Sequence, residues 1–402
     1  MGGCLRDLLR GRIPHDWDVA TSARPERVAA LFARTLPTGL AYGTVSVQTG
    51  VRWVQVTTFR SESSYGDRRH PAHVRWLGEV EGDLARRDFT VNAMALGLDG
   101  RLVDPWGGLA DLQSGLIRAV GDPQERFAED PLRVLRGARL AAETGWRMEE
   151  ATVQAALRGA ADLPGVSRER LFSEMNRLLH GGHAAAGVEL LWRTGAAWSV
   201  LGRAAGELHA EGLRHVAEAV ERAPREEAAR WLAFLHAFAR PAELAARAIL
   251  PGRPRRAVSE LARTLTRLEE GGGPPAANAE RVRRLGPAAR SLVALLGREQ
   301  AVLLAGWLAA HPAGCPRPRL AALAGSWARA LREVTERGDP CLPADLSLDG
   351  SEVASRLGAG GPAVGRSLEC LAAWVREDPA RNRPELLREH LERECRPGRG
   401  PR

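Results

Sequence analysis

The sequence contains no lysine, so all 57 of its basic side chains are arginines. It also has no apolar run approaching the roughly 20 residues that a membrane-spanning helix requires, and no basic segment followed by an apolar one stands at its start. Together with 44% hydrophobic and 26% charged residues, these absences exclude transmembrane, fibrous and disordered classes. We expect a cytoplasmic protein with no membrane contact.

Cysteine is also scarce. The chain has five, an odd number, and no two of them are spaced as Cys-x-x-Cys. They are Cys4, Cys315, Cys341, Cys370 and Cys395. Neither a disulfide framework nor a zinc ribbon has this pattern, so we expect reduced thiols and no structural zinc.

The 402 residues suit two to four domains of roughly 100–200 residues each. The formal charge is +8. Because the arginine fork matches phosphate oxygens, this balance suits a polyanion such as nucleic acid. A genome biased toward arginine, alanine and glycine codons would give the same composition without any function, so composition leaves both interpretations open.

Strand patterns occur only in the first part of the chain. Residues 44–49 and 52–58 alternate apolar and polar side chains around a turn at Gly50, and residues 91–98 and 101–103 read as a hairpin. From Asp130 onward the apolar spacing is helical. Two such stripes are Leu132, Leu135, Ala138 and Ala142, and Leu171, Met175, Leu178 and Leu179. The sequence therefore predicts an α+β portion followed only by helices.

Two short motifs near the N-terminus suggest chemistry. Gly2-Gly3 before a short helix would let backbone N–H groups approach a phosphate, although an ordinary tight turn has the same residues. On an extended segment Asp16 and Asp18 point to the same side, within reach of shared cations. Such a pair builds a two-metal phosphoryl-transfer site. An isolated Asp-x-Asp is more often a solvated turn.

With these motifs the sequence resembles the class II tRNA nucleotidyltransferases, which are the bacterial and eukaryotic CCA-adding enzymes, and their relatives the bacterial poly(A) polymerases. The resemblance spans nearly the whole chain. Its further motifs are VTTFR (56–60), the loop Tyr65–Pro71, RRDFTVNAM (86–94), DPWGGLADL (104–112), EDPLRVLRGAR (129–139) and SRERLFSEMNRLL (167–179). Several motifs in the family's order make the likeness specific.

The resemblance implies an α+β fold: a nucleotidyltransferase-type catalytic head with a small mixed sheet, followed by an all-α neck, body and tail. We expect the head over residues 1–120 and a neck with the nucleotide-selecting motif over 121–185. The body would occupy 186–300 and the tRNA-binding tail 301–402, ending in a disordered basic segment.

The implied activity is template-independent addition of C and A, from CTP and ATP, to the 3′ end of tRNA. Asp16 and Asp18 would be the catalytic residues and would hold Mg²⁺. An enzyme that adds only A, or only CC, or a poly(A) polymerase shares the motifs, and the loop from Ser63 to Val74 argues against the CC-only enzyme. A catalytically impaired RNA-binding relative is the alternative from another class.

The resemblance also implies which residues bind the nucleotide. The block Arg86-Arg87-Asp88 would contact phosphate and ribose. Asp130 and Arg133, one turn apart on a helix beginning at Asp130, would select C and A, because a carboxylate accepts from their exocyclic amino groups; an ordinary helix-surface salt bridge is the alternative. The full expected set is Gly2, Gly3, Arg6, Arg86, Arg87, Asp88, Asn92, Asp130, Arg133, Arg136 and Arg139.

Three features depart from the family pattern. Relatives carry a helix and a strand before the Gly-Gly turn, so we expect the first strand of the sheet to be missing and an edge to be unpaired. Gln55 stands where relatives often have glutamate and cannot supply a third anionic charge. His236 is followed by Ala237 where some relatives have a His-Asp metal motif, so we expect a packed histidine and no second hydrolase site.

Overall fold

The computed structural model describes residues 1–14, 16–65, 71–201, 210–236, 238, 249–270, 278–310, 318–358 and 360–395. The chain divides into two compact units. The first comprises Met1–Glu207 and Ala248–Pro251, and the second Leu208–Arg247 and Gly252–Arg402. The expected boundaries between neck, body and tail stay a prediction.

A small mixed sheet forms the centre of the head. Its strands are β1 (Asp18–Thr21), β2 (Thr35–Gly39), β3 (Thr44–Thr49) and β4 (Arg52–Thr58). They lie in the order β1-β4-β3-β2, with β1 parallel to β4 and the other pairs antiparallel. Helix α2 (Pro25–Leu31) buries Val28 against valines of β3 and β4. Both predicted strands and the mixed sheet are confirmed.

The rest of the head consists of short elements. They are α1 (Gly3–Leu9), η1 (Leu40–Tyr42), β5 (Arg60–Tyr65), β6 (Pro71–Trp76), α3 (Val80–Ala85), η2 (Thr90–Asn92), β7 (Ala95–Leu96), β8 (Leu102–Val103), α4 (Gly108–Ser114) and β9 (Leu116–Ile117). The hairpin β7-β8 is present. The predicted strand 91–98 is wrong over its first half, because Asn92 N–H and Ala93 N–H donate to the carbonyls of Phe89 and Thr90 and close a 3₁₀ turn.

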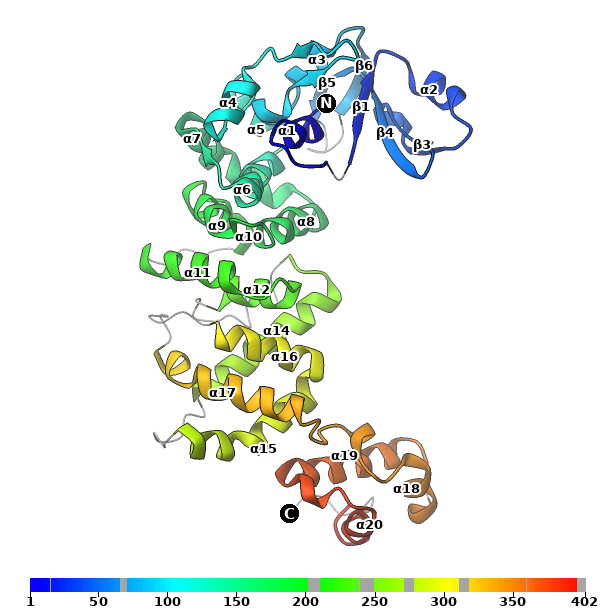
Figure 1. The fold of residues 1–402 in the computed structure, drawn as a ribbon, viewed down its shortest axis with the longest axis vertical. Coiled ribbons are helices and arrows are strands. Elements are labelled where there is room, and N and C mark those ends of the chain that lie inside the picture. Colours follow the sequence, from blue (N-terminus) through cyan, green and yellow to red (C-terminus); the bar gives the residue numbers. More distant parts are fainter. Residues whose placement is uncertain are drawn as a thin grey trace. The chain divides into compact units, whose positions relative to one another are not determined.

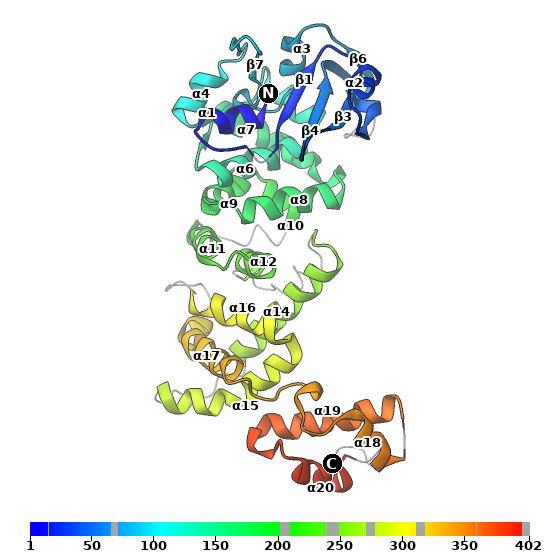
Figure 2. The same cartoon turned by 45° about the vertical axis from the view of Figure 1, so that its right-hand side comes forward.

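Helices follow the head in the first unit. They are α5 (Pro123–Glu129), α6 (Leu132–Thr144), α7 (Glu150–Gly159), η3 (Ala160–Gly165), α8 (Arg168–Leu179), α9 (Ala184–Arg193) and α10 (Ala196–Leu201). Helix α6 packs against α8 and α9 (Figures 1 and 2), and both predicted apolar stripes are buried there. One short strand, β10 (Arg147–Met148), pairs with β9, so the expectation of helices alone beyond Asp130 is wrong at this point.

Helix α6 begins at Leu132, not at Asp130. Asp130 has an extended backbone, with φ −142° and ψ 100°, because a residue that precedes proline avoids the helical region. Pro131 then starts the helix as its N-cap. Asp130 therefore belongs to the junction between α5 and α6, which corrects its predicted place on the helix.

All described elements of the second unit are helical. They are α11 (Ala210–Arg222), α12 (Glu227–Leu235), α14 (Gly252–Glu270), α15 (Asn278–Leu296), α16 (Arg298–Ala309), α17 (Pro318–Glu336), η5 (Pro343–Asp345), α18 (Gly350–Leu357), α19 (Pro362–Glu377), η6 (Pro379–Arg381) and α20 (Pro384–Arg393). His236 is fully buried against Trp307, which confirms a packed histidine. Among the described helices, none is long and apolar enough to cross a membrane.

Some predictions fall outside the described residues. They concern the tip of the 65–71 loop, Ala237 and the basic end at 396–402.

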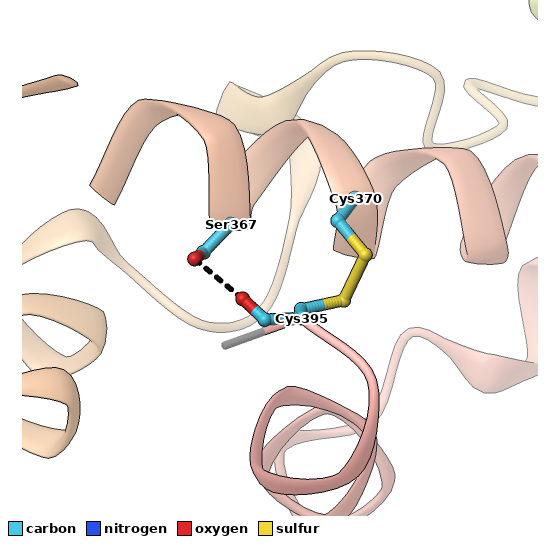
Figure 3. Close-up of a disulfide and its surroundings, with 3 residues drawn as sticks. All are labelled: Ser367, Cys370 and Cys395. Atoms are coloured by element: carbon cyan, nitrogen blue, oxygen red, sulfur yellow. Dashed lines mark hydrogen bonds between the residues drawn. A yellow bond between two sulfur atoms is a disulfide. The ribbon is translucent and has the colours of Figure 1, made fainter. Parts of the chain in front are cut away.

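The cysteines of the last helices contradict the expectation of reduced thiols. Cys370 on α19 is bonded to Cys395, which follows α20 (Figure 3). Cys4 and Cys341 are free and buried. The Ser367 hydroxyl donates to the Cys395 carbonyl at 2.7 Å. Packing of α19 on α20 brings together two cysteines 25 positions apart, a pairing that the odd count concealed.

Candidate active site

A cavity of about 1160 Å³ lies in the first unit, lined by residues of the head and of helices α6 and α8. Every predicted site residue except Gly2 lines it. These are Gly3, Arg6, Asp16, Asp18, Arg86, Arg87, Asp88, Asn92, Asp130, Arg133, Arg136 and Arg139. The fold thus collects in one hollow side chains that the sequence separates by more than a hundred positions.

The two predicted metal ligands stand at the start of β1. Asp18 is its first residue and is partly buried, whereas Asp16 lies before the strand and is exposed. Burial raises the pKa of the Asp18 carboxyl; Arg87 and the N-terminal amino group oppose this, and the Asp16 carboxylate adds to it. A divalent cation would relieve the repulsion between the two carboxylates, and their oxygens are the ligands that hard cations prefer. The donor set therefore fits such an ion.

Gln55 is the register partner of Asp18 on the parallel strand β4. It is exposed, and its backbone N–H donates to the Trp17 carbonyl at 3.3 Å. Since an amide carries no charge, Gln55 adds no anion beside the Asp16–Asp18 pair.

Gly2 is not among the residues that line the cavity. Its φ is +73°, and a Cβ there would lie 2.2 Å from Nη1 of Arg87. Its N–H donates to the Met94 carbonyl at 3.0 Å, so it is engaged within the protein. A glycine suits this position because its φ is positive and the end of the Arg87 side chain lies where a Cβ would stand. Gly3 and Arg6, in contrast, line the cavity.

Asp88 is the centre of a buried polar network. It accepts from Asn92 Nδ2 at 3.1 Å and from Arg136 Nε at 2.8 Å, and Arg6 donates to the Asn92 side-chain oxygen at 2.8 Å. Burial alone would raise the pKa of Asp88, but Arg136 and these hydrogen bonds hold it well below its usual range. The Asp88 carboxylate in turn raises the pKa of Arg136. The network joins the 86–92 block to helix α6.

The two arginines before Asp88 are anchored by one buried carboxylate. Arg86 Nη2 lies 2.7 Å and Arg87 Nη2 3.5 Å from the Asp83 oxygens. Burial lowers the pKa of Arg87, and Asp83 opposes that effect. Because Asp83 fixes both side chains, their guanidinium groups line the cavity in defined positions.

Asp130 and Arg133 both line the cavity, but each also has protein partners. Arg170 Nη2 donates to Asp130 at 2.8 Å. Arg133 is buried and donates to Glu129 at 2.5 Å and to the carbonyls of Arg126 and Arg86 at 2.9 Å each. Three of its five N–H groups are therefore engaged by the protein.

Arg136 and Arg139 share Glu174, a buried carboxylate of α8. Arg139 Nε lies 2.6 Å and Arg136 Nη1 3.7 Å from its oxygens. Arg139 also contacts Glu143 at 2.9 Å. Glu174 thus holds the two arginines of α6 that face the cavity.

Sequence reasoning missed several residues that line the same cavity. Among them are Arg10, Arg12, Arg60, Arg170, Arg177 and His180. Arg170 and Arg177 belong to the 167–179 motif, which was the sequence signal that could have identified them as site residues. The Arg10 guanidinium lies 4.6 Å from the centroid of the Trp146 ring, and only the fold brings these two residues, distant in the sequence, together. A lining this rich in guanidinium groups suits a polyphosphate ligand.

Two family descriptions match parts of this chain. Residues 1–118 match the poly A polymerase head domain, and residues 145–201 match the probable RNA and SrmB-binding site of polymerase A. The CCA-adding enzyme of Lactiplantibacillus plantarum is 44% identical over 194 residues, 48% of each chain. That of Geobacillus sp. is 43% identical over 196 residues, again 48% of each. The chain thus matches about half the length of these curated relatives.

Solved structures extend the likeness. The Bacillus stearothermophilus CCA-adding enzyme in complex with CTP has a TM-score of 0.72 and 29% identity, covering 98% of this chain and 93% of that one. The Thermotoga maritima CCA-adding enzyme complexed with tRNA has a TM-score of 0.63 and covers 97% and 90%; at 18% identity it shows the fold alone. The family resemblance and the predicted fold class are confirmed.

Proposed function

We propose that this chain, whose residues 1–118 match the poly A polymerase head domain, adds C and A from CTP and ATP to the 3′ end of tRNA without a template. One observation carries the proposal: a single cavity contains the Asp16–Asp18 pair, the Arg86-Arg87-Asp88 block and the Asp130–Arg133 pair. The similar curated relatives are named CCA-adding enzymes, and the similar structure with bound CTP supports that nucleotide as a substrate.

The reaction is attack of the RNA 3′-hydroxyl on the α-phosphate, with pyrophosphate leaving in line. Members of this family use a divalent metal, and we propose Mg²⁺, held by Asp16 and Asp18. When bound, such ions lower the pKa of the attacking hydroxyl and stabilise charge on the phosphate. Arg86 and Arg87, fixed by Asp83, orient the triphosphate.

Base choice would rest on Asp130 and Arg133. A carboxylate oxygen accepts two hydrogen bonds, so Asp130 keeps capacity for an exocyclic amino group beside its bond from Arg170. Guanine O6 and uracil O4 would face that carboxylate as a second acceptor, which disfavours both bases. The bonds from Arg133 to Glu129 and two backbone carbonyls hold its guanidinium group beside the same cavity.

For the remaining predicted nucleotide-binding residues we propose supporting roles. Arg136 and Arg139 would present positive charge to the phosphates while Asp88 and Glu174 hold them in place. Asn92 and Arg6 would keep Asp88 oriented through the bonds of that network. The arginine-rich helices of the second unit would bind the tRNA body through its phosphates, in the cytoplasm.

Addition of only A and poly(A) synthesis use the same residues and remain the nearest alternatives. The neutral Gln55 favours a catalytically impaired RNA-binding relative, and both carboxylates of the Asp16–Asp18 pair argue against it.

The test supplies tRNA ending before CCA, in C, or in CC, with CTP and ATP singly and together, and sequences the products. Completion of CCA on all three substrates supports the proposal. Extension of only the CC-ended substrate by one A indicates the A-only enzyme, and long A tails indicate a poly(A) polymerase. Binding of tRNA without any extension indicates the impaired relative.

A further inference from the structure

The end of the second unit brings three metal-ligating side chains together. Cys370 lies on α19, His390 on α20 and Cys395 just after it, and their ligand atoms all lie within 4.8 Å of one another. Cys395 is buried and the other two are partly buried. This group belongs to a different unit from the nucleotide cavity and has no part in the proposed reaction.

We propose that these residues form a redox-dependent zinc site. The oxidised chain has the Cys370–Cys395 disulfide (Figure 3). The reduced chain binds Zn²⁺ through two thiolates and the His390 imidazole, which is the donor set that zinc prefers. The fourth tetrahedral position is left for water.

The geometry needs only small movements. With zinc–sulfur bonds of about 2.3 Å and zinc–nitrogen bonds of about 2.0 Å, tetrahedral ligand atoms lie roughly 3.5–3.8 Å apart. The three ligand atoms already lie within 4.8 Å. Cleaving the disulfide lets the sulfurs separate to that spacing by side-chain rotation, because the Cα atoms are only 5.9 Å apart.

Neighbouring groups hold two of the three ligands, His390 and Cys395, in place. The His390 ring stacks on Trp374 with centroids 4.0 Å apart, and the Arg381 guanidinium lies 5.1 Å from the same Trp374 ring. The Ser367 hydroxyl bonds to the Cys395 carbonyl. Ligand orientation by such contacts is what a metal site requires.

The redox step balances. A dithiol reductant supplies two electrons and two protons, the bond between Sγ of Cys370 and Sγ of Cys395 breaks, two thiols form, and the reductant becomes a disulfide. Zinc binding then releases the two thiol protons to solvent as the thiolates coordinate.

The experiment compares the full chain in its two redox states. Oxidised protein, with the disulfide verified by intact mass, and protein reduced by a dithiol without oxygen are each equilibrated with Zn²⁺, freed of excess, and analysed for bound zinc. Any zinc at the Asp16–Asp18 pair is common to both states, so the difference reports the cysteine site. Binding of Co²⁺ is followed in parallel by its thiolate charge-transfer absorption.

We expect one more Zn²⁺ per chain in the reduced state, with cobalt–thiolate absorption in that state alone. Cys370→Ser, and His390→Phe, which keeps a ring against Trp374, should weaken binding by at least about ten-fold, since even residues that only orient a ligand have effects of that size. Cys341→Ser removes a buried free thiol elsewhere and should change nothing. Equal zinc in both redox states of the wild-type chain overturns the proposal, whether or not the variants fold.

Discussion

Replacing Asp88 by asparagine tests the network that joins the head to helix α6. The amide is nearly isosteric, so the bond from the Phe89 N–H persists while the charge opposite Arg136 is lost. Removing one partner of a fully buried ion pair costs about 3–5 kcal/mol. The Arg136 side chain is 38% exposed, so water screens the remaining charge and we expect a loss of about 1–3 kcal/mol.

The expected loss depends on pH with a definite sign. The folded-state pKa of Asp88 is lowered, so its stabilisation is complete above the unfolded pKa of about 3.9 and declines as the pH falls below it. Between pH 7 and pH 3.5 the difference in unfolding free energy between wild type and Asp88→Asn should shrink by roughly 0.7 kcal/mol.

The assay is thermal and urea unfolding of both proteins at each pH. A loss of about 2 kcal/mol lowers the melting temperature of a unit of about 200 residues by roughly 4–8 °C. Glu150→Gln is the matched control, because its ion pair with Arg193 is exposed on both sides and should contribute less than about 0.5 kcal/mol. A shift no larger than the control, or a difference that stays constant with pH, refutes the role assigned to this pair.

Three further predictions concern the cavity. Asp16→Ala and Asp18→Ala should abolish nucleotide addition and leave tRNA binding in filter assays nearly intact; wild-type turnover in either variant contradicts the metal assignment. Asp130→Ala should reduce discrimination of CTP over UTP and of ATP over GTP by roughly ten-fold to a hundred-fold in competition assays. The control Arg170→Ala breaks the same ion pair but keeps the Asp130 acceptor. Equal losses of discrimination in both variants would assign the effect to the salt bridge. Gly2→Ala should lower the unfolding free energy by about 1–2 kcal/mol, because φ is positive there and the added Cβ collides with a neighbouring side chain; an unchanged melting temperature would show that the turn adapts.

Local patterns predicted much of this protein. The alternation over residues 44–49 and 52–58 predicted strands because side-chain direction in a strand depends only on the adjacent residues. The apolar stripes predicted α6 and α8 for the corresponding reason at helical spacing. The ordered motifs predicted the head, and every site residue that they predicted except Gly2 lines the cavity.

Tertiary structure decided the partners of those residues. Arg136 on α6 meets Asp88 of the head across 48 positions, and Arg170 on α8 meets Asp130 at the junction of α5 and α6 across 40. Each pair depends on how segments distant in the sequence pack. The strand predicted over residues 91–98 is replaced at its start by a 3₁₀ turn over residues 90–92, because the turn satisfies their buried backbone groups.

The pairing of Cys370 with Cys395 was likewise beyond the sequence. The composition by itself determined that the chain is basic and that its basic side chains other than histidine are arginines, and local periodicity determined where most of its strands and helices form. Contacts between distant segments decide which carboxylate pairs with which arginine and which two cysteines form the disulfide. Those contacts form only when the chain folds and buries its apolar faces, because packing of these faces, and not spacing along the chain, brings the distant segments together.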